Sequence, residues 1–579
     1  MAVGDTIYPS HRFIEEDFEI GTTDGSGSEG TGTPPEENTE LPEQDPYVPV
    51  PSSPLTGCDP NPTTTGSLAG YVQTYDKFPE TVTVGSVYRV QGSVDTGMTS
   101  YYVRWNGSVW EEHVNPTIRN AIDPETMPWA LVRLENGEFE FAPFCWKPRR
   151  VGDGDTNPAP AFIDRPIRDV FFYQNRLGFL SDESAVFSVA GDHGDFWRRT
   201  VLDYLDADSF SVAATTTDVA LLDHAVAFND GLMLFSEQRQ FSLVNGEAGT
   251  SAASIEMNPV TNYSMARGVR PVPLGDQAIF ASDQGSYTAI QEYTRLDGRD
   301  ALDAAEITAH VPGLLPLGVS KLIPASGINA LFALARNSDR PDRIYAYQYY
   351  WDGERKVVSA WRRWAFKGAQ VISGTFIDGF LYLVTRRSNK LYIERIDLRE
   401  DSASGKQDHL IYLDRQVTLT GTYDEEGDET SFTLPYEPDP TALRLMHTTD
   451  SGQPETLVPG SRIAIVGAVV TVQGHLPDAM TIGELFRTSV TLSRQFALDY
   501  QQRPKTNGRL QLRAMKVNYS RTPFFTAVVH PYGPDANIDE ASRKKVTQIT
   551  AQKVGYSGHR LGSMPYETGT GAFSVAADA

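Results

Sequence analysis

IRDVFFYQNRLGFLSDESAVFSVAGDHGDFW, residues 167–197, alternates short apolar runs with polar turns. Its centre, Tyr173–Ser181, joins two apolar strand patterns through a polar turn, and a short Asp-Glu-Ser turn leads into a third run, Ala185–Val189. Apolar runs of this length, bounded by turn residues, are typical of β-strands. The stretch therefore predicts a meander of short antiparallel strands.

The same kind of strand core recurs along the chain at a spacing of about 50 residues, which is the size of a propeller blade. One four-stranded blade cannot bury both of its faces, so blades stack around an axis. Long amphipathic helices are hard to find between residues 167 and 398. We therefore predict an all-β fold with a β-propeller rather than a sandwich. The five cores are Leu177–Leu180, Leu232–Phe235, Ala278–Ala281, Leu331–Leu334 and Leu381–Val384.

The chain is too long for one compact core, so several domains are expected. We predict a low-complexity acidic segment over residues 1–66, a β-rich leading region over 67–165 and propeller blades over 166–400. A β-rich accessory domain, serving as a platform for interactions, is expected over 401–500, and a basic β region over 501–579. Within the leading region, Asn106-Gly107 lies between two β-rich runs and predicts a hairpin with a type I′ turn.

Charge is strongly acidic and unevenly placed. The formal net charge is −25; residues 1–66 carry thirteen acids and one base, whereas residues 503–579 carry eleven bases and five acids. A protein with this charge balance is not expected to have the basic surface with which proteins bind nucleic acid. Two interpretations remain open: an acidic wall that lets DNA slide past without adhesion, or charge that only keeps the protein soluble.

Two cysteines, Cys58 and Cys145, are too few for a disulfide framework and have no metal-ligand spacing. We expect both to be reduced thiols in a protein that folds in a cytoplasm. No apolar run is long enough for a membrane-spanning helix, and the amino terminus has no secretory signal.

Candidate chemical sites are weak. Asp153, Asp155 and Asn157 carry oxygen ligands at alternate positions, as a calcium loop does, but Pro158 stands where an EF-hand needs glycine, so an Asx-turn is favoured over a metal. No histidine lies in a catalytic-triad or zinc motif, and no pair of carboxylates is singled out for hydrolysis of sugars. Alternation in Tyr345–Tyr349 indicates packing between blades rather than a sugar platform. No catalytic residue and no cofactor is expected.

Several segments, in order along most of the chain, resemble the nozzle family of short-tailed, T7-like bacteriophages, also called tail tubular protein B. The matching segments include residues 126–133 (TMPWALVR), 151–158 (VGDGDTNP), 175–181 (NRLGFLS), 224–229 (HAVAFN), 305–312 (AEITAHVP) and 508–513 (GRLQLR). The amino-terminal region departs from the family, whose members usually open on a substantial β region. Two interpretations of residues 1–66 remain open: a low-complexity replacement of that region, or the remainder of a shortened gene.

The resemblance implies a virion structural protein of the phage tail, assembled in the host cytoplasm and not an enzyme. Its expected state is a homo-hexamer with a propeller-based subunit, placed below an adaptor ring of the tail tubular protein A type. Tail fibres or spikes are expected near that junction, and genomic double-stranded DNA is expected to pass through the lumen without sequence-specific binding. Channel or interface candidates are the acidic turn residues Asp424, Glu425, Glu426, Asp428 and Glu429, and the basic residues Arg543, Lys544 and Lys545.

Two alternative functions remain. One is a propeller enzyme that degrades host-surface polysaccharide, and the other is a receptor-binding propeller without catalysis. Depolymerisation of host polysaccharide would distinguish the first, and binding of the isolated protein to host cells the second.

Overall fold

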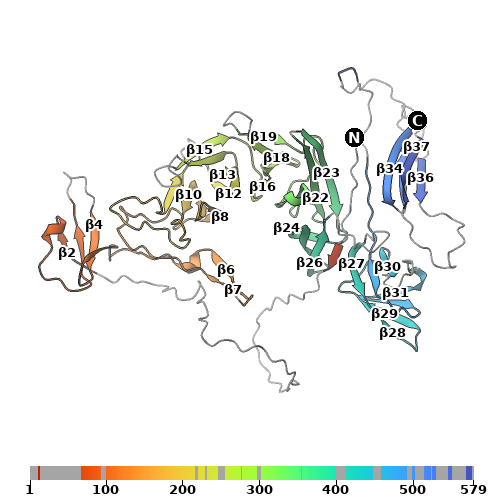
Figure 1. The fold of residues 1–579 in the computed structure, drawn as a ribbon, viewed down its shortest axis with the longest axis horizontal. Coiled ribbons are helices and arrows are strands. Elements are labelled where there is room, and N and C mark those ends of the chain that lie inside the picture. The colour runs from red at the N-terminus through yellow and green to blue at the C-terminus, as the bar shows by residue number, and fades with distance from the viewer. Residues whose placement is uncertain are drawn as a thin grey trace. The chain divides into compact units, whose positions relative to one another are not determined.

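We describe the protein from a computed structural model. It describes residues 11–13, 67–92, 100–134, 136–214, 219–228, 231–245, 255–275, 277–295, 302–353, 355–399, 413–447, 458, 460–491, 499–501, 514–522, 524–529, 545–550 and 569–576. The described residues form strands and four single-turn 3₁₀ helices, Tyr75–Lys77, Pro124–Thr126, Ser326–Ile328 and Gly460–Arg462. The all-β prediction is confirmed (Figure 1). The chain divides into two compact units, residues 21–367 and residues 1–20 with 368–579.

Four consecutive four-stranded antiparallel sheets form the centre of the unit of residues 21–367. The first two contain β8 (Ile167–Tyr173), β9 (Arg176–Ser181), β10 (Ser184–Phe187) and β11 (Phe210–Ala213), then β12 (Leu222–Phe228), β13 (Gly231–Ser236), β14 (Gln240–Asn245) and β15 (Ile255–Thr261). The next two contain β16 (Val272–Leu274), β17 (Gln277–Asp283), β18 (Thr288–Arg295) and β19 (Leu302–Glu306), then β20 (Lys321–Ala325), β21 (Ala330–Leu334), β22 (Arg343–Asp352) and β23 (Arg355–Ala365). We call these sheets blades 1 to 4.

Each predicted strand core lies in the second strand of a consecutive sheet, in β9, β13, β17, β21 and β25 (Phe380–Arg387). The cores in β13, β17 and β21 are continuously apolar because these strands are buried on both faces, whereas buried and half-buried residues alternate in the core of β25. In β13, Leu232 and Leu234 pack in the core shared with blade 1, while Met233 and Phe235 pack in the core shared with blade 3. The same alternation in β17 and β21 joins blades 3 and 4. Stacked four-stranded sheets of this kind give the propeller-like fold that the repeat predicted.

The remaining sheets of this unit precede blade 1 in the chain. β2 (Leu68–Val72), β3 (Val87–Val90), β4 (Tyr101–Trp105) and β5 (Trp110–His113) form one sheet, in which β2 and β3 are parallel. The Glu112 carboxylate accepts hydrogen bonds from the Thr200 hydroxyl (2.6 Å) and the Val201 amide (3.0 Å), which connects β5 to the segment before β11. β6 (Trp129–Arg133) and β7 (Phe139–Pro143) form a separate two-stranded hairpin.

The unit containing residues 368–579 has a seven-stranded sheet in the order β24-β25-β26-β1-β27-β33-β30. A second sheet, β28-β29-β32-β31, packs on it through a shared core that includes Phe432, Leu445 and Ile482. The fifth predicted core therefore lies in this larger sheet and not in a separate four-stranded blade. The strands are β1 (His11–Phe13), β24 (Gln370–Ile377), β26 (Lys390–Asp397), β27 (Asp414–Leu419), β28 (Thr422–Asp424), β29 (Glu429–Thr433), β30 (Leu443–His447), β31 (Ile463–Val466), β32 (Val469–Gln473) and β33 (Met480–Glu484). Two further pairs are β34 (Ala514–Thr522) with β37 (Gly569–Ala576), and β35 (Phe524–Val529) with β36 (Lys545–Thr550).

Turn chemistry explains how the strands of residues 167–197 connect. Gln174 and Asn175 both have positive φ, 47° and 59°, as a two-residue type I′ turn requires. In contrast, the hairpin expected at Asn106-Gly107 forms, but its turn type is wrong. Trp105 pairs with Trp110, so the loop has four residues, and the Asn106 side-chain oxygen accepts the amides of Ser108 and Val109.

The expectation of two reduced cysteines is also wrong for Cys145, which is disulfide-bonded. Cys58, the other cysteine of the sequence, lies outside the described residues. Cysteine count alone could not reveal the bond, because disulfide formation depends on the distance between two side chains that are far apart in the chain.

Candidate functional site

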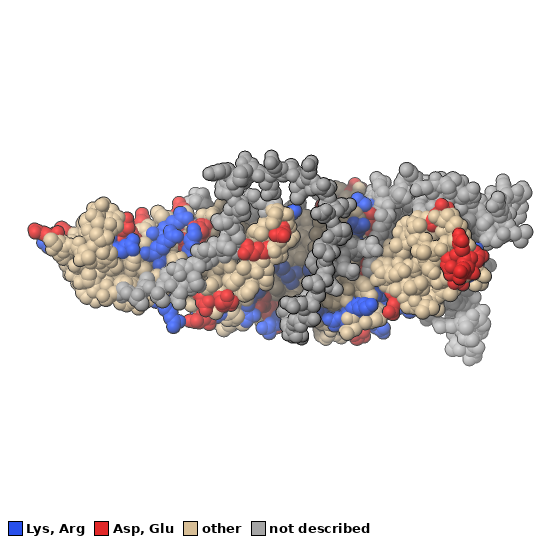
Figure 2. All heavy atoms as spheres, turned by 90° about the horizontal axis from the view of Figure 1, so that it is seen from below, with Lys and Arg blue, Asp and Glu red and all other residues tan. Residues whose placement is uncertain are grey.

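The predicted acidic residues lie together on the exposed turn between β28 and β29, where Asp424 pairs with Glu429. The Glu426 amide donates to the Asp424 carboxylate (3.1 Å), and the Tyr423 hydroxyl donates to the Asp428 carboxylate (3.0 Å). This hydrogen bond to Asp428 raises the pKa of Tyr423. Figure 2 shows a compact group of acidic side chains in the part of the protein that carries β28 and β29. The turn thus presents negative charge to solvent on a hydrogen-bonded scaffold.

The predicted basic residues are not described in the same detail. Arg543 and Lys544 lie outside the described residues, and Lys545 is the first residue of β36, where only its backbone is described. Their expected role at an interface stays a prediction.

Residues 153–157 form a hydrogen-bonded loop. The Asp153 carboxylate accepts the amides of Asp155 (3.1 Å) and Thr156 (3.0 Å) and the Thr156 hydroxyl (3.0 Å). Burial opposes ionisation of Asp153, but these hydrogen bonds outweigh it and lower the pKa. Asn157 donates to the carbonyls of Val151 (3.0 Å) and Arg198 (3.2 Å). The loop has the geometry of an Asx-turn that connects the leading region to blade 1.

Among the described residues, no three or more His, Cys, Asp or Glu side chains are grouped so that they could hold a metal ion. None of the helices in the described ranges is long and apolar enough to cross a bilayer.

Arg176, which lies within residues 167–197, has a structural role that the sequence did not reveal. Its side chain is buried, and its guanidinium donates to the carbonyls of Ser188, Asp206, Ala207 and Asp208 at 2.5–3.2 Å. The guanidinium also lies over the Phe210 ring, 5.1 Å from its centroid. One side chain therefore holds the segment 206–208 against blade 1.

Asp169 connects three successive blades. Its carboxylate accepts the Ala225 amide of β12 (2.9 Å) and the Arg270 guanidinium from the segment before β16 (2.7 Å). His224 lies 3.9 Å from the same carboxylate, and among the described residues neither of its ring nitrogens is hydrogen-bonded. Burial lowers the pKa of His224, although Asp169 opposes this shift. The first strands of the blades are therefore held by charge as well as by apolar packing.

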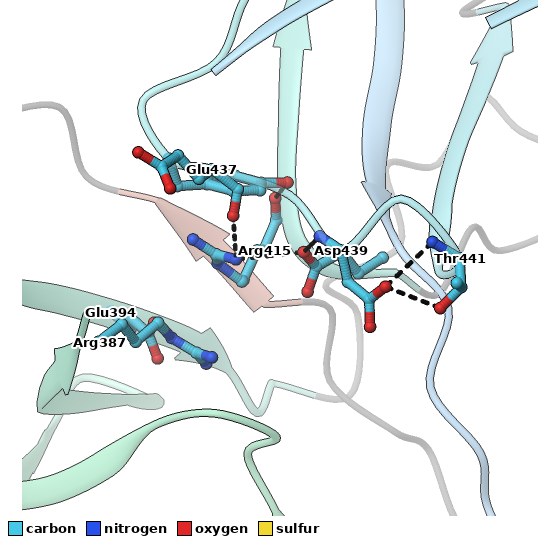
Figure 3. Close-up of polar contacts among 8 residues, drawn as sticks. Arg387, Glu394, Arg415, Glu437, Asp439 and Thr441 are labelled. Carbon is cyan, nitrogen blue, oxygen red and sulfur yellow. Dashed lines mark hydrogen bonds and ion pairs between the residues drawn. The ribbon is translucent and has the colours of Figure 1, made fainter. Parts of the chain in front are cut away.

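A second charged cluster lies in the seven-stranded sheet (Figure 3). Arg415 donates to the Glu484 carboxylate (3.1 Å) and the Glu437 carbonyl (3.3 Å), and its guanidinium lies 3.6 Å from the centroid of the Tyr436 ring. On the β25–β26 hairpin, Arg387 donates to the fully buried Glu394 (3.0 Å). Burial lowers the pKa of Arg415, and Glu484 opposes the shift. The Arg415–Glu484 pair joins β27 to β33, and the Arg387–Glu394 pair joins β25 to β26.

A family model for bacteriophage nozzle proteins matches residues 60–579. The chain belongs to this family. It is also 29% identical over 533 residues to the tail tubular protein gp12 of Escherichia phage T7, a match that covers 88% of this chain and 64% of the relative. The chain therefore spans less than two thirds of the length of that curated relative. The resemblance inferred from the short segments is confirmed.

This chain also has distant likenesses among solved structures. They include Hsv2p of Kluyveromyces lactis (10% identity, TM-score 0.26, covering 50% of this chain and 84% of that one). Another is the β-propeller domain of Vanderwaltozyma polyspora Nup133 (8% identity, TM-score 0.25, covering 52% and 89%). These likenesses are too distant to add to the description of the fold.

Proposed function

We propose that this protein is a structural subunit of a short, non-contractile phage tail, where copies of it form the nozzle through which DNA leaves the virion. The observation that carries the proposal is membership of the bacteriophage nozzle family over residues 60–579. The side chains described above support a scaffold role, because their charged groups bind backbone and neighbouring strands. The proposal assigns no catalytic step to this chain.

The proposed assembly is a six-fold ring closed by heterologous contacts, in which one surface of each copy binds a different surface of the next. The proposed partners are an adaptor ring of the tail tubular protein A type and tail fibres or spikes near their junction. Genomic duplex DNA passes through the lumen. The basic stretch at residues 543–545 is proposed to dock on an acidic face of a neighbour.

The lumen of this ring is proposed to be acidic. A net charge of −25 and the exposed Asp424–Glu429 turn support this idea, because like charge keeps phosphates from adhering to the wall. A net negative charge also disfavours the lysine and arginine contacts to phosphates on which non-specific DNA binding depends.

Electron microscopy of the purified chain, alone and mixed with its adaptor ring, tests the proposal. We expect a six-fold ring with a central channel, formed alone or only on the adaptor. Reversal of the charges at Arg543, Lys544 and Lys545 should weaken ring assembly or its attachment. A chain that stays monomeric and ignores the adaptor would contradict the nozzle assignment.

A further inference from the structure

The hairpin of β6 and β7 has an unusually apolar exposed face. Register places Leu131 opposite Phe141 and Arg133 opposite Phe139, so these side chains and Trp129 share one face. Trp129 is 46% exposed, and Leu131, Phe139 and Phe141 are each 64% exposed. We call these four residues the aromatic face. Large apolar side chains gathered on one surface of a soluble protein mark an interaction site.

The aromatic face is held in place before any partner binds. Trp129 and Phe141 contact each other across the strands with ring centroids 5.2 Å apart. Met127, just before β6, is buried in the core that covers one side of blade 1, and Trp146, after β7, contacts Phe179 of that blade. Both ends of the hairpin are therefore anchored, which lowers the entropy lost on binding.

The hairpin also lacks the layers that stabilise the blades. Each blade has four strands and apolar packing against a neighbour, whereas β6 and β7 form a sheet of two strands (Figure 1). An isolated two-stranded hairpin is marginally stable in water unless its apolar face is covered. Covering this face would thus stabilise the hairpin itself.

The chemistry of the hairpin favours a protein partner. Its tip carries the polar residues Asn136 and Glu138, which would have to enter the lipid if the hairpin inserted into a membrane. Arg133 and Glu138 are exposed at the end of an otherwise apolar face. An apolar centre with charged residues at its edge is typical of protein interfaces.

A matching apolar strip occurs on the same unit of the chain. Alternation along β8 leaves Val170 41% exposed and Phe172 59% exposed, and β8 is a terminal strand of its sheet. The aromatic face and the β8 strip remain exposed together, so the hairpin does not cover the strip of its own chain. Two different apolar surfaces on one subunit are what a ring closed by heterologous contacts needs.

We propose that the aromatic face of one copy packs on the β8 strip of the next copy, as one β-sheet stacks on another. The partner that covers the aromatic face is therefore a second copy of this chain. This inference rests on the proposed ring and names the contact that closes it.

Cysteine crosslinking tests the contact. Phe141→Cys and Phe172→Cys variants of the full chain are prepared separately, mixed, oxidised and run on a non-reducing gel. We expect a crosslinked dimer in the mixture and little in either variant alone, because only the mixture places a cysteine on both sides of the contact. The proposal would be overturned if the Phe141→Cys variant crosslinked by itself without the Phe172→Cys variant, or if the mixture of the two variants formed no crosslinked dimer.

Self-association provides a second test that does not depend on oxidation. Leu131→Glu places a charge in the aromatic face and is expected to weaken self-association at least about ten-fold in analytical ultracentrifugation, the loss typical of an interface hot spot. The control is Val109→Glu, since Val109 is 56% exposed in the loop between β4 and β5. Equal self-association of the two variants would overturn the proposal. The proposal would also be overturned if the wild type floated with lipid vesicles and the Leu131→Glu variant did not, because the aromatic face would then bind lipid.

Electron microscopy distinguishes this inference from the proposed function. A Leu131→Glu chain that still forms the six-fold ring on the adaptor overturns the hairpin contact and leaves the nozzle assignment intact. A wild-type chain that forms no ring contradicts the nozzle assignment itself.

Discussion

At the scale of single residues, Arg176 shows how backbone carbonyls can provide the hydrogen-bond acceptors for a buried cation. Its guanidinium bonds four carbonyls that lie 12 to 32 residues away along the chain. Arg176→Met would leave several of these carbonyls buried without a donor. We expect a loss of about 3 kcal/mol in the free energy of unfolding, measured by urea denaturation. The control, Arg340→Met, removes an exposed ion pair with Asp339 and should change stability by less than about 0.5 kcal/mol. Equal effects of the two substitutions would contradict the structural role of Arg176.

His224 makes stability depend on pH in a predictable direction. Burial lowers its folded-state pKa, so the unfolded chain binds a proton more readily than the folded one. The contribution of His224 is therefore fully present above the unfolded pKa of about 6.5 and is lost as pH falls through the lower folded value. The groups that face His224 are Asp169, Arg270 and Asp223.

His224→Leu should therefore flatten the fall in unfolding midpoint between about pH 7 and pH 5, measured by urea denaturation across that range. The matched control is His310→Gln, because His310 is exposed at the surface. A wild-type midpoint that falls no faster on acidification than that of His224→Leu would contradict the assignment.

At the scale of elements, the second strand of each blade should be its most protected part. β9, β13, β17 and β21 each have a hydrogen-bonded neighbour on both sides, and their side chains pack into the cores between blades. Terminal strands such as β15 and β23 pair on one side within their sheets, which leaves alternate amides outside the ladder. In hydrogen-exchange mass spectrometry, we expect peptides from second strands to exchange at least about 100-fold more slowly than those from terminal strands. Uniform exchange across a blade would contradict this ranking.

The same elements show how far the sequence could predict the structure. The second strands were predictable because burial on both faces leaves a continuous apolar run, and because the runs recur at a regular spacing. The type I′ turn predicted at Asn106-Gly107 was wrong, because the side-chain oxygen of Asn106 accepts the amides of Ser108 and Val109 in a loop of four residues. The contact of Asp169 with Arg270 joins residues 101 positions apart, and no local pattern records such a pairing. The aromatic face did leave a signal, because large apolar residues alternate at 129, 131, 139 and 141, but their exposure depends on how the hairpin packs.

At the scale of the whole molecule, the net charge of −25 predicts that this protein does not adhere to DNA. We expect the wild-type chain to show no binding to a labelled 30-base-pair duplex in fluorescence anisotropy, at about 50 mM or 200 mM salt, because its net negative charge repels phosphates. Reversal of Glu425, Glu426 and Glu429 to Lys creates one local basic patch on the β28–β29 turn. If that patch binds three phosphates, its affinity should fall roughly 40-fold between these two salt concentrations, since the logarithm of the affinity changes by about 0.9 per phosphate for each decade of salt.

The control reverses three scattered exposed acids, Glu80, Glu125 and Asp339, which changes the net charge equally without forming a patch. Binding by the control as tight as that by the turn variant would show that net charge alone governs adhesion, and binding by the wild type at 200 mM salt would contradict an acidic, non-adhesive channel.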